Sequence, residues 1–228
     1  CEEGIYVHST GFQTEEDALA DKFVFRQGRS RETSYARDYD RLLDLLRDRS
    51  RSLKARLRDF LLVAGEAQQL LDSENMAELA AFCTEPWAIS AETAAGSGSW
   101  EAAACQCLQD LEILEPDWLT LLKQWEQAPE LPGFAPQDPE KLERIAVYFA
   151  FRYLLKAVND GDLLGRAQFC LLGVLTVDRL SRFTELSEAL RLFSREIEHD
   201  EDNLATLREQ FWQTEGLSLS ALLAAFCG

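Results

Sequence analysis

The feature that most constrains the fold is an apolar run interrupted by two cations. The run reads VYFAFRYLLKAVNDGD (Val147–Asp162), and it carries Arg152 and Lys156 one helical turn apart. A helix that is apolar on every side is normally buried, and buried Arg and Lys side chains are rare unless they are paired. We therefore expect this segment either to pair two cations with carboxylates in the interior or to direct them into a cleft.

Charge is distributed unevenly along the chain. The net charge is −17 over 228 residues, yet residues 26–58 hold 11 Lys and Arg against 5 Asp and Glu, whereas residues 59–143 hold 2 against 17. The acidic middle argues against nucleic acid as a partner. The basic stretch indicates a helix with a solvated face of mixed charge, or a surface that grips an acidic partner. No apolar run reaches the roughly 18 residues of a spanning helix, so no membrane association is predicted.

The six cysteines form no C-x-x-C pair. Cys105 and Cys107 lie two apart in a helical pattern, so they point to different faces and chelate a metal poorly. Other cysteines lie among apolar residues, and free thiols in such places indicate a reducing compartment, which predicts a cytoplasmic protein. The chain begins at Cys1 and contains one methionine. This indicates a fragment whose N-terminal part is missing, with a processed lipoprotein as the alternative.

Helical periodicity dominates the chain after residue 30. We expect an all-α fold, an irregular multi-helix bundle with a short irregular N-terminal segment in which Lys22–Arg26 alternates like a strand. Pro116 is a favourable first-turn residue, and Asp162 is a favourable N-cap. The expected helices are Tyr35–Arg49, Leu53–Leu71, Ser73–Phe82, Trp100–Leu114, Asp117–Gln127, Pro139 to about Asn159, and Leu163–Arg182.

Prolines suggest how the chain is divided. The segment Ala128–Pro139 contains four of the six prolines, which is typical of a linker. We expect an irregular segment at 1–30, an N-terminal helical subdomain at 31–128, a linker at 129–139 and a C-terminal helical subdomain at 140–228.

One apolar seam in the C-terminal part has a single exception. Apolar residues recur at intervals of four and three residues. The pattern requires an apolar residue at position 200, but this residue is Asp200. Either one continuous helix carries this carboxylate on its buried seam with a local perturbation, or the helix ends near His199 and Asp200 caps a new one. We favour the continuous helix. The seam consists of Leu186, Leu190, Phe193, Ile197, Leu204, Leu207 and Phe211.

Polar side chains embedded in this apolar region form two rows. The first row has residues four positions apart and carries two cations. The second row has residues three and four positions apart and carries an acid, a histidine and an amide. If the two helices pack together, the rows meet. The result is either an internal salt-bridge network that fixes helix register or a polar pocket for an anionic cofactor or a substrate. The rows are Tyr148, Arg152, Lys156 and Glu196, His199, Asn203, with Asp160, Asp162, Arg166, Glu198 and Asp200 beside them.

Several common catalytic sites are absent from the sequence. Glu196-x-x-His199 is one half of a helical di-iron motif, and no second copy occurs. The sequence contains no H-E-x-x-H, no P-loop and no G-x-G-x-x-G. No serine stands in the setting of a nucleophile elbow.

Three runs of residues resemble one protein family. VYFAFRYLLKAVNDGDLLGRAQFCLL, which begins at Val147, and LFSREIEHDEDNL (Leu192–Leu204) resemble the C-terminal part of bacterial flagellin lysine-N-methylases. LQDLEILEPDWLTLL (Leu108–Leu122) is similar to the central helical pair of the same family. The opening Cys1-Glu2-Glu3 looks like the end of the family's cysteine-rich N-terminal region, so the segment 1–30 would be its remnant.

This resemblance implies methyl transfer from S-adenosylmethionine to lysine side chains of flagellin. It also implies an iron–sulfur cluster or zinc in the cysteine-rich region, of which at most Cys1 is present here, so the metal site belongs to the full-length parent. The alternatives are a non-catalytic helical module that binds a partner protein and a lipoprotein helical domain. On the first interpretation, Glu196 and His199 are the candidate catalytic residues, and Tyr148, Arg152, Lys156, Asp160, Asp162 and Asn203 are the candidate cofactor-binding residues.

Overall fold

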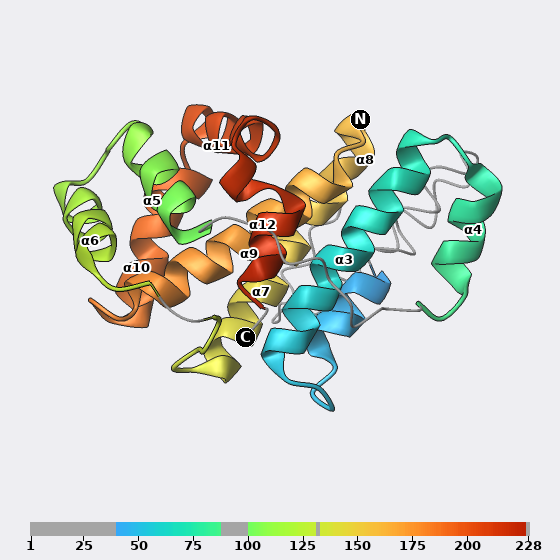
Figure 1. Cartoon of the computed structure of the whole chain (residues 1–228), viewed down its shortest axis with the longest axis horizontal. Coiled ribbons are helices and arrows are strands. Elements are labelled where there is room, and N and C mark those ends of the chain that lie inside the picture. Colours follow the sequence, from blue (N-terminus) through green and yellow to red (C-terminus); the bar gives the residue numbers. More distant parts are fainter. Residues whose placement is uncertain (1–39, 88–99, 131–132, 227–228) are drawn as a thin grey trace, which may run out of the picture.

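Helices account for all the regular structure in the described part of the chain. The computed structural model describes residues 40–87, 100–130 and 133–226 (Figure 1). Within these ranges it contains helices and helical turns but no strand, which confirms the all-α prediction. The strand expected at Lys22–Arg26 and the irregular segment 1–30 lie outside the described residues.

The bounds of the helices follow the expected pattern for most of the chain. None of the described helices is both long enough and apolar enough to cross a membrane. After the end of a helix at 40–47 come α3 (Leu53–Asp72), α4 (Met76–Thr84), α5 (Trp100–Asp110), α6 (Pro116–Gln127), α7 (Pro139–Tyr153), the 3-10 turn η1 (Leu154–Lys156), α8 (Ala157–Asp160), α9 (Leu163–Leu180), α10 (Leu186–Phe193), the π-helical turn η2 (Ser194–Glu198), α11 (Glu201–Gln213), η3 (Glu215–Leu217) and α12 (Leu219–Ala224).

Helix α9 lies at the centre of the fold. Every residue of α9 except Leu164 is buried, and α3, α7 and α10 pack directly on it. Figure 1 shows α9 crossing the middle of the molecule, with α3 and α4 on one side and α5, α6 and α10 on the other. Because the surrounding helices bury apolar stripes against α9, the described residues form one continuous core.

The proline-rich segment is tied to this core. Arg179 Nη2 donates to the Pro129 carbonyl at 2.6 Å, and the Phe134 N–H donates to the Ala225 carbonyl at 2.8 Å. The Phe134 ring also packs against Phe226, with 5.5 Å between the centroids. Helices from both sides of the segment share one core, and the subdomain boundary placed here stays a prediction.

Helix α5 ends at Asp110, so the helix expected to reach Leu114 is shorter than predicted. The backbone N–H of Leu114 donates to Glu196 Oε2 at 2.9 Å, and that of Glu115 donates to Glu196 Oε1 at 2.6 Å. The N–H of Glu112 donates to Asn203 Oδ1 at 2.9 Å. The side chains of Glu196 and Asn203 accept N–H groups that would bond within α5 if this helix continued. These contacts come from distant residues, so no local sequence pattern predicts them.

The apolar run Val147–Asp162 does not form one continuous α-helix to Asn159. Helix α7 ends at Tyr153, and η1 and α8 continue the chain to Gly161. Gly161 has a φ of 75°, the left-handed conformation that commonly ends a helix. The side chain of Asp162 then accepts the N–H of Gly165 at 2.8 Å, so the predicted N-cap of α9 is confirmed.

The prediction of one continuous helix across position 200 is wrong. Helix α10 runs into the π-helical turn η2 and stops, and Asp200 caps α11 by accepting the N–H of Asn203 at 2.7 Å. An unpaired carboxylate on a buried seam is costly, whereas at an N-cap it satisfies backbone donors and favours the helix dipole. The local perturbation expected there is real and takes the form of the π-helical turn.

Replacing Gly173 by Ala should destabilise the protein. A Cβ atom there would lie 2.9 Å from Phe149 Cε2 and 3.2 Å from Phe193 Cζ, and both rings are fully buried. Overpacking should outweigh the helix propensity of Ala and lower the free energy of unfolding by about 1 kcal/mol in equilibrium urea unfolding.

The matched control is Gly65→Ala in α3. The nearest atom there, Leu219 Cδ2 at 2.9 Å, is the end of a flexible side chain that can move aside. This variant should be neutral, or more stable by up to about 1 kcal/mol. Equal losses of unfolding free energy in the two variants would contradict the close packing of Gly173 against Phe149 and Phe193.

Candidate functional site

The two cations of α7 and η1 lie at the surface. Arg152 and Lys156 are both exposed, and the Arg152 side chain retains 39% of its accessible surface. Of the two alternatives, the burial of both cations in the interior is therefore wrong, because only the apolar side of the run is buried. The alternative of a cleft stays a prediction. The expected carboxylate partner is present for Arg152, whose Nε lies 3.5 Å from Glu198 Oε1.

Glu198 is the buried centre of a cluster at the C-terminal end of α7. The hydroxyls of Tyr148 and Tyr153 donate to Glu198 Oε1 at 3.1 and 2.9 Å. Burial raises the pKa of both tyrosines, and the nearby Glu198 carboxylate raises it further, so both hydroxyls remain protonated donors. The second oxygen, Glu198 Oε2, is buried and has no hydrogen-bond partner.

Lys156 lies beside this cluster in a positive environment. Its Nζ is 4.9 Å from the centroid of the Tyr153 ring, a cation–π contact. Burial lowers the pKa of Lys156, and the charges of Arg166, Arg152 and Arg208 lower it further. Among the described residues no carboxylate lies within ion-pair distance of its ammonium group. The positive surroundings of Lys156 therefore favour the binding of an anion.

Asp160 and Asp162 hold the turn after α8 against α9 and α11. Arg166 and Arg208 both pair with Asp160, and Arg208 Nη2 also lies 2.6 Å from Asp162 Oδ2. Burial acts to raise the pKa of Asp160, but hydrogen bonds from Arg166 and from the Asp162 N–H outweigh it, and the pKa lies below its usual value. These carboxylates are therefore engaged by arginines in the folded chain.

Glu196 and Asn203 face a different part of the molecule. Glu196 is completely buried, and both of its oxygens accept backbone N–H groups of the α5–α6 connection. Asn203 Nδ2 donates to the carbonyls of Glu112 and Glu196 at 2.8 and 2.9 Å. These contacts give Glu196 and Asn203 a structural role. His199 is exposed, and a catalytic role for Glu196 and His199 stays a prediction.

The two polar rows do not meet as expected, because Glu196 and Asn203 contact residues 112–115 and His199 is exposed. The row of Tyr148 and Arg152 contacts Glu198, which the sequence placed beside the rows, and not Glu196. Spacing along a helix shows which residues share a face, but it does not show which face turns toward a neighbouring helix. Tyr153, which the methylase interpretation offers beside Tyr148 as a channel residue, lies in this cluster. Arg208 was missing from the predicted site, and its solvated setting on α11 offered no signal.

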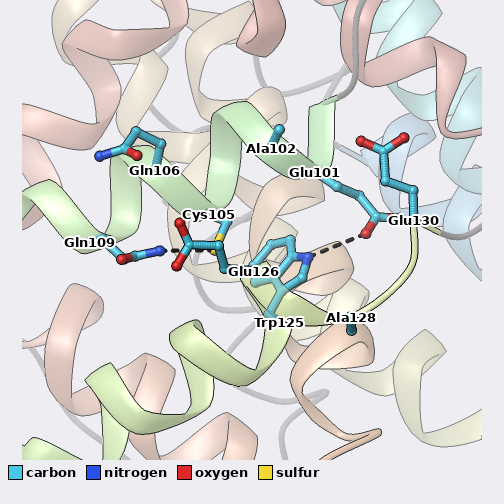
Figure 2. A pocket seen from close by; sticks show the side chains of 9 residues that line it. All are labelled: Glu101, Ala102, Cys105, Gln106, Gln109, Trp125, Glu126, Ala128 and Glu130. Atoms are coloured by element: carbon cyan, nitrogen blue, oxygen red, sulfur yellow. Dashed lines mark hydrogen bonds between the residues drawn. The ribbon is translucent and has the colours of Figure 1, made fainter.

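A cavity of about 190 Å³ lies between α5 and α6, away from the predicted site residues (Figure 2). Trp125 Nε1 donates to Glu101 Oε2 at 3.2 Å, and Gln109 Nε2 donates to Cys105 Sγ at 3.3 Å. Burial raises the pKa of the Cys105 thiol, so it stays protonated and is a poor nucleophile. Figure 2 shows the side chain of Glu126 beside this thiol. The cavity offers a polar lining without an activated group.

No metal site is present in the described ranges. They contain no cluster of His, Cys, Asp or Glu that could hold a metal ion. Cys105, Cys107 and Cys170 are buried free thiols. For Cys170 this agrees with the prediction of a thiol among apolar residues. Cys1, the predicted ligand in the full-length parent, lies outside the described residues.

Comparisons with known proteins do not assign this chain to a family. No family model, no curated protein and no solved structure matches it. The resemblance to flagellin lysine-N-methylases therefore depends on the three runs of residues quoted above.

Replacing Glu196 by Ala should be strongly destabilising. The change leaves the N–H groups of Leu114 and Glu115 without their charged acceptor, and we expect the free energy of unfolding to fall by about 3 kcal/mol. Equilibrium urea unfolding measures this loss. Glu209→Ala, an exposed carboxylate on α11, is the control and should change stability by less than about 0.5 kcal/mol. Similar effects in the two variants would show that Glu196 does not hold the α5–α6 connection.

Proposed function

We propose that this chain is part of a protein-lysine N-methyltransferase that uses S-adenosylmethionine to methylate lysines of flagellin in the cytoplasm. The resemblance of residues 108–122 and 145–211 to that family supports the proposal. Two of the similar runs also contact each other, since Glu196 and Asn203 bind the backbone of residues 112–115. Residues that resemble one family in separate parts of the sequence thus belong to one structural unit.

The observation that carries the proposal is Lys156, a cation without a carboxylate partner, near a buried carboxylate with one free oxygen, Glu198, at the end of α7. Lys156 has no carboxylate partner among the described residues, and Glu198 Oε2 in the same cluster has no hydrogen-bond partner. S-adenosylmethionine ends in an amino-acid group that carries one carboxylate and one ammonium. A cation and a carboxylate side by side are the complement of that group.

Each residue of the cluster has a role in this proposal. Lys156 and Arg152 bind the carboxylate, and Glu198 accepts the ammonium. The rings of Tyr148 and Tyr153 form an apolar wall that excludes water. Asp160 and Asp162 act as positioning residues, because they fix Arg166 and Arg208 beside Lys156. The bound cofactor supplies an electrophilic methyl group, which a neutral lysine amine of the substrate accepts.

Binding of S-adenosylmethionine to the 228-residue chain tests this assignment. We expect saturable binding in calorimetry, and we expect Lys156→Met to weaken it by about tenfold, the effect of losing one charge-assisted contact. The same variant should be at least as stable as the parent sequence, because it removes repulsion from three arginines.

Arg191→Met is the matched control for this experiment. Arg191 is an exposed arginine that pairs with Glu115 and Glu188 on the α10 side of the molecule. It should leave the affinity for S-adenosylmethionine unchanged. Absence of binding by the chain, or equal losses in the two variants, would contradict the assignment of the site.

The test of methyl transfer uses the full-length parent that the resemblance implies, because the resemblance also implies a metal-binding region for the activity. In that protein, Lys156→Met should lower the methylation of flagellin lysines without lowering the melting temperature. Mass spectrometry of flagellin gives the first quantity, and circular dichroism gives the second. A parallel loss of both would mean that the cluster only holds the helices in register.

One observation favours the second candidate, a non-catalytic module that binds a partner helix. Trp212 on α11 keeps 66% of its surface exposed, and it is the most exposed large apolar side chain among the described residues. A module of this kind binds flagellin without S-adenosylmethionine, and Trp212→Ala abolishes the binding. Binding that requires the cofactor would favour the methyltransferase.

A further inference from the structure

Lys156 has unusual surroundings for an exposed lysine. It lies at the surface in η1, and among the described residues no carboxylate lies within ion-pair distance of its Nζ. The exposed Lys141 on α7 differs in this respect, because its Nζ lies 2.9 Å from Asp138 Oδ2. The amino group of Lys156 is therefore accessible to molecules in solution and is not held in a salt bridge.

Two arginines near Lys156 come from other helices and are held in place by carboxylates. Arg166 on α9 and Arg208 on α11 both pair with Asp160. Arg208 Nη2 also lies 2.6 Å from Asp162 Oδ2. Because these contacts fix the two guanidinium groups, their positive charges continue to act on Lys156 in the folded chain.

A third arginine, Arg152, precedes Lys156 by one helical turn. Its Nε donates to the Tyr153 hydroxyl at 3.2 Å and lies 3.5 Å from Glu198 Oε1. The Tyr153 ring also contacts Lys156, whose Nζ is 4.9 Å from the ring centroid. Among the described residues of this cluster, three arginines thus pair with three carboxylates, and Lys156 is the additional cation.

These surroundings make the amino group of Lys156 easier to deprotonate. Partial burial at the edge of the core lowers its pKa, the charges of the three arginines lower it further, and the Glu198 carboxylate opposes them only weakly. For Lys141, in contrast, the hydrogen bond to Asp138 raises the pKa. Only the neutral amine is a nucleophile, so Lys156 has the larger reactive fraction at neutral pH.

We propose that Lys156 is a modification site that takes an acyl group from an acyl phosphate. The neutral amine attacks the carbonyl carbon, so that an N–C bond forms and the C–O bond to phosphate breaks. Phosphate leaves with the electron pair of that bond, and the amine releases one proton to the solvent. The product is an uncharged amide. The reaction needs no S-adenosylmethionine, so this inference goes beyond the proposed function and does not depend on it.

The positive surroundings favour this class of donor over an uncharged one. An acyl phosphate is an anion, and the guanidinium groups act more strongly on the Lys156 amine than the Glu198 carboxylate does, so they attract the donor to it. The same charges stabilise the negative charge that develops on the carbonyl oxygen and on the leaving phosphate. An uncharged donor gains only from the larger neutral fraction of the amine.

The test is acetylation of the full 228-residue chain with acetyl phosphate at neutral pH, followed by mass spectrometry of each lysine-containing peptide. We expect Lys156 to react at least about threefold faster than Lys141 and Lys123, which are exposed on α7 and α6. This advantage should shrink as the pH rises toward the ordinary pKa of lysine, because every amine then becomes neutral. The comparison is made within one folded molecule and needs no substitution.

Three controls separate the effect of the surroundings from that of exposure. The chain unfolded in guanidinium chloride should lose the preference, because the arginines no longer lie near Lys156. Arg208→Gln should lower the rate at Lys156 toward that at Lys141, and circular dichroism establishes that this variant is folded. Arg191→Gln removes an exposed, paired arginine on α10 and should leave the rate at Lys156 unchanged.

The same experiment with an uncharged donor, the N-hydroxysuccinimide ester of acetic acid, tests the choice of an acyl phosphate. A larger preference for Lys156 with acetyl phosphate than with this ester supports the proposal. An equal or larger preference with the ester would overturn it, because the reactivity would then belong to the amine alone. Reaction of Lys156 no faster than that of Lys141 and Lys123, or an unchanged preference in the unfolded chain, would also overturn it.

Discussion

The burial of α9 on all sides is the constraint on which the rest of the structure depends. A helix without a solvated face needs neighbours around its whole circumference, and α3, α7, α10, α11 and α12 provide them. Even its charged residues are enclosed, as Arg179 Nε lies 3.1 Å from Glu101 Oε2 with both side chains nearly inaccessible. Such buried pairs contribute little net stability, but breaking one is costly, so they favour one arrangement of the helices.

The two charged clusters of the chain follow from where helices end around this core. Helix α7 stops at Tyr153, and η1 then turns Lys156 onto the Tyr153 ring at the edge of the core. Helix α3 starts at Leu53, where the basic stretch of the sequence reaches the core and Arg56 becomes buried. Around Glu198 the three arginines Arg152, Arg166 and Arg208 face three carboxylates, Glu198, Asp160 and Asp162, so Lys156 is the additional cation there.

Local patterns predicted the helices well wherever the determining contacts are local. The bounds of α3 and α6 and the N-cap of α9 follow from apolar spacing, Pro116 and Asp162, all of which act within a turn of the chain. The prediction failed at the end of α5 and at Asp200. At the end of α5 the deciding contacts join residues more than 80 positions apart, such as Glu196 with the Leu114 N–H. At Asp200 the contact is local, the N-cap to Asn203, and the prediction failed because it gave the apolar seam more weight than the cap. Spacing along the chain also did not show which acid of η2 faces Tyr148, because the answer depends on how the two helices are oriented in the fold.

The central claim is that the cluster of Lys156 and Glu198 binds a ligand in addition to joining α7, α9 and η2. Hydrogen exchange of the 228-residue chain, measured with and without S-adenosylmethionine, tests it most directly. The account predicts slower exchange of backbone amides in residues 148–160 and 194–200 when the cofactor is present, and unchanged exchange in α3 and α4. Unchanged exchange at the cluster, or protection confined to other helices, would contradict it.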